Sequence, residues 1–213
     1  MAKVVIFDVF GTLVQIQNRR SPYLRLLKLA RLQGRRPLPD DALQLMTLDM
    51  TLASAARHFG IKISDTQLQE LEQRLAEELE SMALFSDAPE AIELLQNSGV
   101  RVGVCSNLAS SYGLDVKRLL PRLDAYTFSY EVGHVKPDPA IYRAACASLG
   151  IEAGHWFDSH GRVLMLGDSR QCDRDGPREV GVMGYLLGRA GKGDFRNLLE
   201  FAKAVVSDEL STG

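Results

Sequence analysis

The sequence has few cysteines and no long apolar run, and each shortage argues against a class of protein. Its three cysteines, Cys105, Cys146 and Cys172, form no Cys-x-x-Cys pair. This usage argues against a disulfide framework and favours a reducing compartment. The first apolar run, Val4 to Phe7, is too short for the core of a signal peptide, and no later run approaches the length of a membrane span. We therefore expect a cytoplasmic protein that does not bind a membrane.

An excess of charge of one sign is also absent. The chain has 25 Lys and Arg against 27 Asp and Glu, a net charge of -2, so its composition does not indicate a nucleic-acid binder. One local run of cations contains no acid: Arg19, Arg20, Arg25, Lys28, Arg31, Arg35 and Arg36. We interpret it as a helical surface neutralised by the acidic segment Asp65 to Glu80. The alternative partners are an anionic substrate, a nucleic acid or a membrane surface.

Short apolar runs alternate with helical patterns over most of the chain. The expected strands are Val4 to Phe7, Val100 to Cys105, Tyr126 to Phe128, Val163 to Leu166 and Val182 to Leu187. Helices are expected at 89–98 and 139–149, each with a proline at its start and a glycine directly after its end. Such alternation is typical of βαβ units with right-handed crossovers. The sequence thus predicts an α/β fold, a Rossmann-like parallel sheet with helices on both faces.

The stretch from Gln15 to Phe85 breaks this alternation, because it contains helical patterns and no convincing strand. One apolar helical face consists of Tyr23, Leu26, Leu27 and Ala30, and another of Leu45, Leu48, Leu52, Ala56 and Phe59. The segment 64–67 has the pattern of a capping box at the start of a further helix. We expect a small helical cap at residues 15–85, inserted into a Rossmann-like core formed by residues 1–14 and 86–213.

Polar residues follow the expected strands. They are Asp8 after the first strand, Ser106 and Asn107 after the second, Lys136 in the loop after the third, and Asp168 with Asp173 after the fourth. Taken singly, an aspartate after a strand is usually a helix cap, and a Ser-Asn pair is usually a turn. In an open parallel sheet, however, ligands bind beyond the carboxyl ends of the strands. The ordered set therefore predicts one functional site at this edge of the sheet.

Four of these segments resemble the motifs of the haloacid dehalogenase-like hydrolase superfamily. They are Asp8 to Leu13, Val104 to Asn107, Val135 to Pro139, and Leu166 to Ser169 with Asp173. The segment 188–199 is also similar to the end of that family's core. The resemblance covers nearly the whole chain outside the expected cap, and it implies a hydrolase that acts on a small-molecule substrate.

The resemblance implies a nucleophile and a metal site. Asp8 would attack a phosphoryl group and form an aspartyl-phosphate, which splits the transfer into two easier steps. The nucleophile and the substrate are both anionic, so a cation is needed between them. Mg²⁺, an oxygen-seeking ion, is expected to bind Asp8, the backbone carbonyl of Phe10 and Asp168. Asp173 is expected to support this site through water or a hydrogen bond.

The same resemblance implies groups that hold the substrate. Lys136 is expected to neutralise developing negative charge. The Ser106 hydroxyl, with Asn107 and nearby backbone N–H groups, is expected to hold a phosphoryl oxygen. Thr12 is expected to orient the loop that carries the nucleophile, and Phe10 to present an apolar wall to the leaving group.

Phe10 departs from the pattern of the family's phosphatases, which carry a second aspartate there to protonate the leaving group. General acid–base help is typically worth about 10²–10⁴-fold, so its loss weakens an ordinary phosphomonoesterase. The 2-haloacid dehalogenases of the superfamily have an aromatic residue at this position, work without metal and grip the halide with a cap arginine. Arg35 and Arg36 lie near that place in the sequence. Those enzymes, however, usually lack a carboxylate where this chain has Asp168.

Three functions therefore stay open. We favour Mg²⁺-dependent hydrolysis of a small phosphorylated metabolite over carbon–halogen hydrolysis and over phosphoryl binding with little turnover. His134, two residues before Lys136, is a candidate for the missing acid, although a loop histidine is more often merely exposed. His155 and His160 are expected at the opposite edge of the sheet. The sequence gives no signal for the oligomeric state.

Overall fold

The central sheet places the strand ends that carry the polar residues side by side. The computed structural model describes residues 4–154 and 163–211, so His155 and His160 lie outside the described residues. Five parallel strands have the order β5-β4-β1-β6-β7. They are β1 (Val4–Phe7), β4 (Arg101–Ser106), β5 (Ala125–Phe128), β6 (Val163–Gly167) and β7 (Met183–Leu186). All five expected strands are confirmed, and β1 lies in the middle with β4 and β6 as its neighbours.

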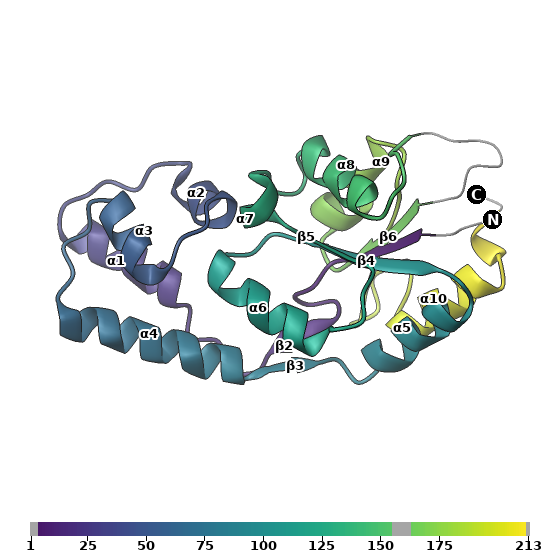
Figure 1. Cartoon of the computed structure of the whole chain (residues 1–213), viewed down its shortest axis with the longest axis horizontal. Helices are drawn as coiled ribbons and strands as arrows, with labels where there is room; N and C mark the ends of the chain where they lie inside the picture. Colours follow the sequence, from purple (N-terminus) through teal and green to yellow (C-terminus); the bar gives the residue numbers. More distant parts are fainter. Residues whose placement is uncertain (1–3, 155–162, 212–213) are drawn as a thin grey trace.

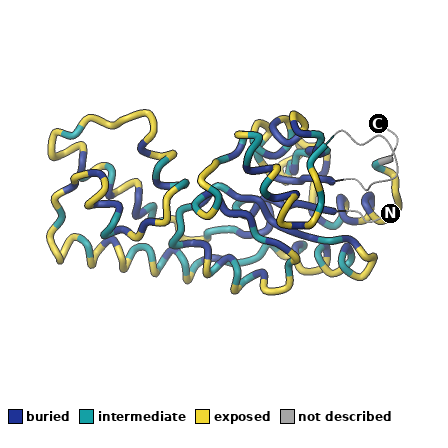
Figure 2. The backbone as a smooth tube through the Cα atoms, turned by 45° about the horizontal axis from the view of Figure 1, so that its top comes forward, coloured by how far each residue is buried: buried dark blue, intermediate teal, exposed yellow. Residues whose placement is uncertain are grey.

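Helices cover both faces of this sheet, as the sequence predicts (Figure 1). On β1, Val5 and Phe7 pack with α5 and α10, whereas Val4 and Ile6 pack with α8 on the other face. All four residues are fully buried, which explains the continuous apolar run, and Figure 2 shows the same burial along the neighbouring strands. The helices of the core are α5 (Ala88–Asn97), α6 (Ser110–Leu119), α7 (Ser129–Val132), α8 (Pro139–Ser148), α9 (Gly176–Arg178) and α10 (Leu198–Val206), with a π-helical turn η1 (Arg170–Asp175) and a 3₁₀ turn η2 (Glu209–Ser211).

Four helices lie together beyond one end of the core and form what we call the helical lobe (Figure 1). They are α1 (Pro22–Leu32), α2 (Asp41–Thr47), α3 (Leu52–His58) and α4 (Asp65–Glu80). The capping box at the start of α4 is present, because Ser64 and Gln67 exchange side-chain and backbone hydrogen bonds. The apolar face from Leu45 to Phe59 belongs to two helices instead of one. The chain is extended at Leu48, and Thr51 caps the start of α3 by accepting the Ser54 N–H.

Two short strands join the lobe to the core, and the expectation of no strand between Gln15 and Phe85 is wrong. β2 (Val14–Ile16) pairs antiparallel with β3 (Met82–Leu84). Each strand has three residues, too few to display an alternating pattern, and each finds its partner more than sixty residues away. The expected boundaries between core and cap, at residues 14/15 and 85/86, therefore fall at this two-stranded ribbon. The division of the chain into these two domains is a proposal. None of the described helices has the length and apolar character that crossing a membrane requires.

Candidate active site

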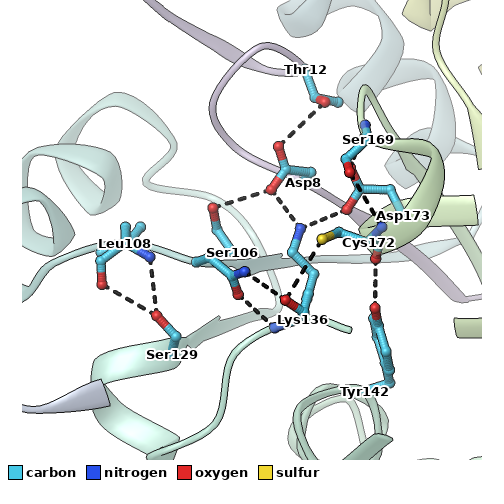
Figure 3. Close-up of polar contacts among 11 residues, drawn as sticks. Asp8, Thr12, Ser106, Leu108, Ser129, Lys136, Tyr142, Ser169, Cys172 and Asp173 are labelled. Atoms are coloured by element: carbon cyan, nitrogen blue, oxygen red, sulfur yellow. Dashed lines mark hydrogen bonds and ion pairs between the residues drawn. The ribbon is translucent and has the colours of Figure 1, made fainter. Parts of the chain in front are cut away.

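Asp8 lies at the centre of the sheet edge, buried between the ends of β4 and β6. Its backbone N–H donates to the Leu166 carbonyl of β6 at 3.0 Å, which holds the residue at the strand end. The Ser106 hydroxyl, at the end of β4, donates to Asp8 Oδ1 at 3.2 Å. Thr12 Oγ1 reaches the other carboxylate oxygen at 3.5 Å, the outer limit of a hydrogen bond. Three side chains from two separate predicted segments thus converge (Figure 3).

Lys136 bridges two buried carboxylates at this site. Its ammonium group donates to Asp8 Oδ1 at 2.7 Å and to Asp173 Oδ1 at 2.6 Å (Figure 3). Burial by itself lowers the pKa of Lys136, but the charges of Asp8 and Asp173 outweigh it and raise the pKa well above its ordinary value. Lys136 therefore carries a permanent positive charge beside Asp8.

Asn107 holds the backbone of Lys136 in place. Its side-chain amide donates to the Lys136 carbonyl at 2.9 Å, and its side-chain oxygen accepts the Lys136 N–H at 2.7 Å. This pair of bonds positions the lysine from the neighbouring strand end. The expected contact of Asn107 with the substrate stays a prediction.

Asp168 completes a cluster of three carboxylates with Asp8 and Asp173. One oxygen from each of them lies within 4.8 Å of the others. Burial, followed by the charge of Asp8, raises the pKa of Asp168, and burial raises the pKa of Asp173 to about 6. The loop from Val9 to Leu13 follows the predicted nucleophile Asp8, and we call it the nucleophile loop. It approaches Asp168 at Gly11, which has φ +87°, and a Cβ there would lie 2.1 Å from a carboxylate oxygen. Glycine is therefore required at position 11.

The donor set of this cluster fits Mg²⁺. Three carboxylates against the single ammonium of Lys136 leave a net charge of -2 when all are ionised, and the candidate ligand atoms are oxygens, which this ion prefers. Both oxygens of Asp173 already accept hydrogen bonds, one from Lys136 and one from the Ser169 N–H at 2.9 Å. Asp168 is better placed to bind a cation directly, as is Asp8 through the oxygen that has only the 3.5 Å contact with Thr12. Asp173 fits the supporting role that the family resemblance implies.

Arg189 is a positioning residue that sequence reasoning missed. Its guanidinium donates to the Thr12 carbonyl of the nucleophile loop at 2.8 Å and pairs with Asp87 at 3.0 and 3.1 Å. It also lies over the Phe85 ring, 3.9 Å from the centroid. The residues are separated by about a hundred positions or more in the chain, so no local pattern indicates this contact.

A cavity of about 330 Å³ lies beside the nucleophile loop, with walls from the helical lobe and from the core. Phe10 is part of its wall, and its ring meets the edge of the Tyr112 ring at a centroid distance of 5.8 Å. The lining is mainly apolar and consists of Phe10, Ile16, Arg19, Ser21, Pro22, Tyr23, Leu24, Leu27, Ala42, Leu45, Met46, Glu78, Asn107, Leu108, Ala109 and Tyr112. The expectation that Phe10 forms an apolar wall agrees with this position.

Glu78 is a buried carboxylate at the junction of lobe and core, and the sequence did not single it out. One oxygen accepts the backbone N–H groups of Arg20 and Ser21, both at 2.6 Å, and the other accepts the Tyr112 hydroxyl at 3.0 Å. Burial raises the pKa of Tyr112, so this hydroxyl keeps its proton. Glu78 is one of many acids on α4, and only its burial distinguishes it from them.

Two candidates from the sequence have partners elsewhere. His134 is exposed, and its ring nitrogen forms a 2.8 Å hydrogen bond with Asp138 instead of facing Asp8. Arg35 forms a bidentate ion pair with Asp41, with both distances 2.6 Å, and lies over the Phe59 ring. Arg35 already has an anion within the lobe, so it is not free to grip a halide.

Replacing Lys136 by methionine should strongly destabilise the protein. The change leaves Asp8 and Asp173 buried without their shared cation, and removing one partner of a buried ion pair typically costs about 3–5 kcal/mol. Urea denaturation should show this loss in the free energy of unfolding. Adding Asp173→Asn to Lys136→Met removes one repelling charge and should recover part of it. Equal stability of the wild type and Lys136→Met would contradict the bridging role.

Sequence comparison identifies the family of this chain. A family model described as haloacid dehalogenase-like hydrolase matches residues 2–181, most of the chain. The chain belongs to this family of hydrolases. Among curated relatives, ribulose-1,5-bisphosphate 5-phosphatase of Halopiger xanaduensis is 29% identical over 119 residues, or 54% of this chain and 47% of the relative. The chain thus aligns with about half the length of that relative.

The chain aligns with a larger share of a second curated relative. The validoxylamine A 7'-phosphate phosphatase of Streptomyces hygroscopicus subsp. limoneus is 27% identical over 165 residues, which is 71% of this chain and 73% of the relative. Both relatives carry names of phosphatases.

Solved structures of the family share the fold of this hydrolase. A 2-haloacid dehalogenase from Pseudomonas syringae pv. Tomato DC3000 gives a TM-score of 0.65 at 18% identity, with 97% of this chain and 99% of the other covered. A family enzyme from Bacteroides thetaiotaomicron, in complex with magnesium and inorganic phosphate, gives 0.59 at 18% identity, with 90% and 96% covered. At these identities the likeness concerns the fold alone, and the fold accommodates both reaction types.

Proposed function

We propose that this hydrolase cleaves small phosphate monoesters with Asp8 as the nucleophile and with Mg²⁺ as cofactor. The observation that carries the proposal is the charge of the site. Among the described residues, one ammonium group, that of Lys136, forms ion pairs within the cluster of Asp8, Asp168 and Asp173. An anionic phosphoryl group can approach this cluster only if further positive charge is present. Asp168 adds the negative charge that Lys136 does not balance, because Lys136 already pairs with Asp8 and Asp173.

The residues of the chain have distinct tasks in the proposed reaction. Lys136 pairs with Asp8 and holds it in place, and its charge also favours a phosphoryl oxygen that approaches the nucleophile. The Ser106 hydroxyl, now donating to Asp8, can turn to a phosphoryl oxygen once the substrate is bound. Arg189 and Thr12 hold the loop in which Asp8 and Phe10 lie. Asp8 then attacks phosphorus, and water cleaves the resulting aspartyl-phosphate.

The proposed metal position follows from the oxygens around Asp8. Mg²⁺ would be held by Asp8, Asp168 and the carbonyl of Phe10, with Asp173 in support. When bound, it supplies the positive charge that lets a carboxylate and a phosphoryl group approach each other. The magnesium and phosphate in the Bacteroides thetaiotaomicron enzyme, together with the phosphatase names of the two relatives, support this assignment.

Carbon–halogen hydrolysis is the second candidate, and Phe10 with its apolar cavity favours it. A halide leaves without a proton, so the absence of an acid at position 10 is no obstacle to such a reaction. Asp168 argues against it, because a further carboxylate beside Asp8 hinders approach of the carboxylate of a 2-haloacid. Assays of halide release from 2-chloropropionate and of phosphate release, each with and without Mg²⁺, distinguish the two reactions.

Mg²⁺ should stabilise the wild type, and replacement of Asp168 should remove the effect. A ligand that binds only the folded state raises its stability by mass action. For a chain of this length each kcal/mol raises the melting temperature by about 2–4 °C. We expect millimolar Mg²⁺ to raise the melting temperature of the wild type by a few degrees and that of Asp168→Asn hardly at all.

Asp175→Asn is the matched control for this measurement. Asp175 is an exposed aspartate seven positions further on, outside the carboxylate cluster, so its variant should keep the full response to Mg²⁺. Calorimetry of Mg²⁺ binding checks the same difference directly. A wild type without a thermal shift and without binding heat would rule out the metal site.

A further inference from the structure

We propose that the substrate is a phosphate monoester of a phenol, whose aromatic ring occupies the cavity beside Phe10. This inference rests on the proposed phosphate hydrolysis at Asp8 and adds the class of leaving group. It follows from two independent properties of the cavity: it contains no group that can give a proton, and its walls are apolar and aromatic.

The polar groups that line the cavity hold their protons for other partners. The Tyr112 hydroxyl donates to Glu78, and the Tyr23 hydroxyl contacts the Met50 carbonyl at 2.9 Å and the Ser111 hydroxyl at 2.7 Å. The Asn107 amide is engaged with the Lys136 backbone. Three polar side chains among the described lining residues still have to be considered as proton donors. Arg19 and Ser21 are far too weak as acids. The Glu78 carboxylate accepts hydrogen bonds from three donors.

The leaving group must therefore depart as an anion. Asp8 attacks phosphorus, the bond between phosphorus and the ester oxygen breaks, and its electron pair leaves with that oxygen. Water then cleaves the aspartyl-phosphate and gives inorganic phosphate and one proton, which the departed anion takes up in solution. Only alcohols that are fairly strong acids leave in this way at a useful rate, and phenols qualify whereas sugars and polyols do not.

The walls of the cavity match an aromatic ring. Phe10 and Tyr112 already meet edge to face, an arrangement that aromatic pairs prefer and that a further ring can extend. Leu27, Leu45 and Met46 add apolar surface from the helical lobe. A dry cavity of about 150 Å³ suffices for benzene, so about 330 Å³ has room for a ring with substituents. A polyol would meet mostly apolar surface here, with few hydrogen-bond partners to replace the water that it loses.

The test is the dependence of kcat/KM on the acidity of the leaving group, because kcat/KM reports the first step. The wild-type holoenzyme with Mg²⁺ is assayed on a series of substituted phenyl phosphates, on glycerol 3-phosphate and on acetyl phosphate. We expect kcat/KM to fall steeply as the phenol becomes a weaker acid, and glycerol 3-phosphate to be at least about 10²-fold poorer than 4-nitrophenyl phosphate. A flat series, or equal rates on glycerol 3-phosphate, would overturn the inference.

Met46→Gln tests the cavity separately from the chemistry. The two side chains have similar size and helix propensity, and Met46 lines the cavity, whose lining does not include Asp8 or Lys136. We expect kcat/KM for 4-nitrophenyl phosphate to fall about three- to tenfold. Acetyl phosphate has a small leaving group that does not fill the cavity, so its kcat/KM should stay unchanged.

Leu43→Gln is the matched control, because Leu43 lies on the same helix, is exposed and does not line the cavity. It should leave both substrates unaffected. Equal losses on both substrates in Met46→Gln, or no loss on either, would show that the ring does not bind in this cavity. If no substrate releases phosphate, acetyl phosphate included, the proposed hydrolysis fails, whereas activity confined to acetyl phosphate overturns only the aryl assignment.

Discussion

Asp8→Asn should reduce phosphate release by about 10⁴-fold or more, to the background of the assay. The amide cannot attack phosphorus, and no other carboxylate can take its place. Asp173 is held by Lys136 and Ser169, and Asp168 follows β6, where it is a proposed ligand of the Mg²⁺. Single-turnover kinetics and mass spectrometry of trapped protein should show a phosphoryl adduct on the wild type and none on the variant.

The fold of Asp8→Asn should survive, which makes the loss of turnover interpretable. Asparagine has nearly the same shape, and its side-chain oxygen can still accept from Lys136 and Ser106. Circular dichroism and the melting temperature check this point. Residual turnover clearly above background in a folded and pure Asp8→Asn preparation would refute the covalent mechanism.

Phe10→Asp should increase the hydrolysis of alkyl phosphates by up to about 10²–10⁴-fold. The backbone at position 10 already lies beside Asp8, and its carbonyl does not depend on the side chain. An aspartate there would put a proton donor near the leaving oxygen, which the present cavity lacks. The gain on 4-nitrophenyl phosphate should be smaller, because that leaving group needs little protonation. Initial rates on one alkyl and one aryl phosphate, compared between variant and wild type, measure the difference.

Phe10→Asn is the control for this gain, since it has the size and polarity of aspartate but no proton to give. It should leave the rate on alkyl phosphates low and should weaken binding of aryl phosphates, because the contact with Tyr112 is lost. If Phe10→Asp and Phe10→Asn behave alike in folded, Mg²⁺-loaded protein, a missing acid is not what limits the wild type.

The five strands and the residues that follow them were predictable from the sequence because they depend on local patterns. Buried parallel strands appear as continuous apolar runs, so β1 and β6 were apparent, and with them the positions of Asp8 and Asp168. The carboxyl ends of such strands meet at one edge whatever the details of packing. The pairing of Lys136 with Asp8 follows from this rule once the loop is assigned to the same edge.

The parts that the sequence did not predict depend on contacts between distant segments. β2 and β3 are stable only as a pair, so three residues of either strand carry no signal alone. Leu45 and Leu52 suggest one helical face, but the extended backbone at Leu48 divides it between two helices.

The sequence by itself predicted an α/β hydrolase with Asp8, Lys136 and further carboxylates at one sheet edge. Only the tertiary structure decided which of those groups touch and what surrounds the leaving group. Burial selects Glu78 from an acidic helix, the approach of the lobe to the core puts Glu78 against Tyr112, and within the core Tyr112 meets Phe10. A local pattern records which residues are apolar or charged, whereas contacts across the chain determine which of them share a cavity.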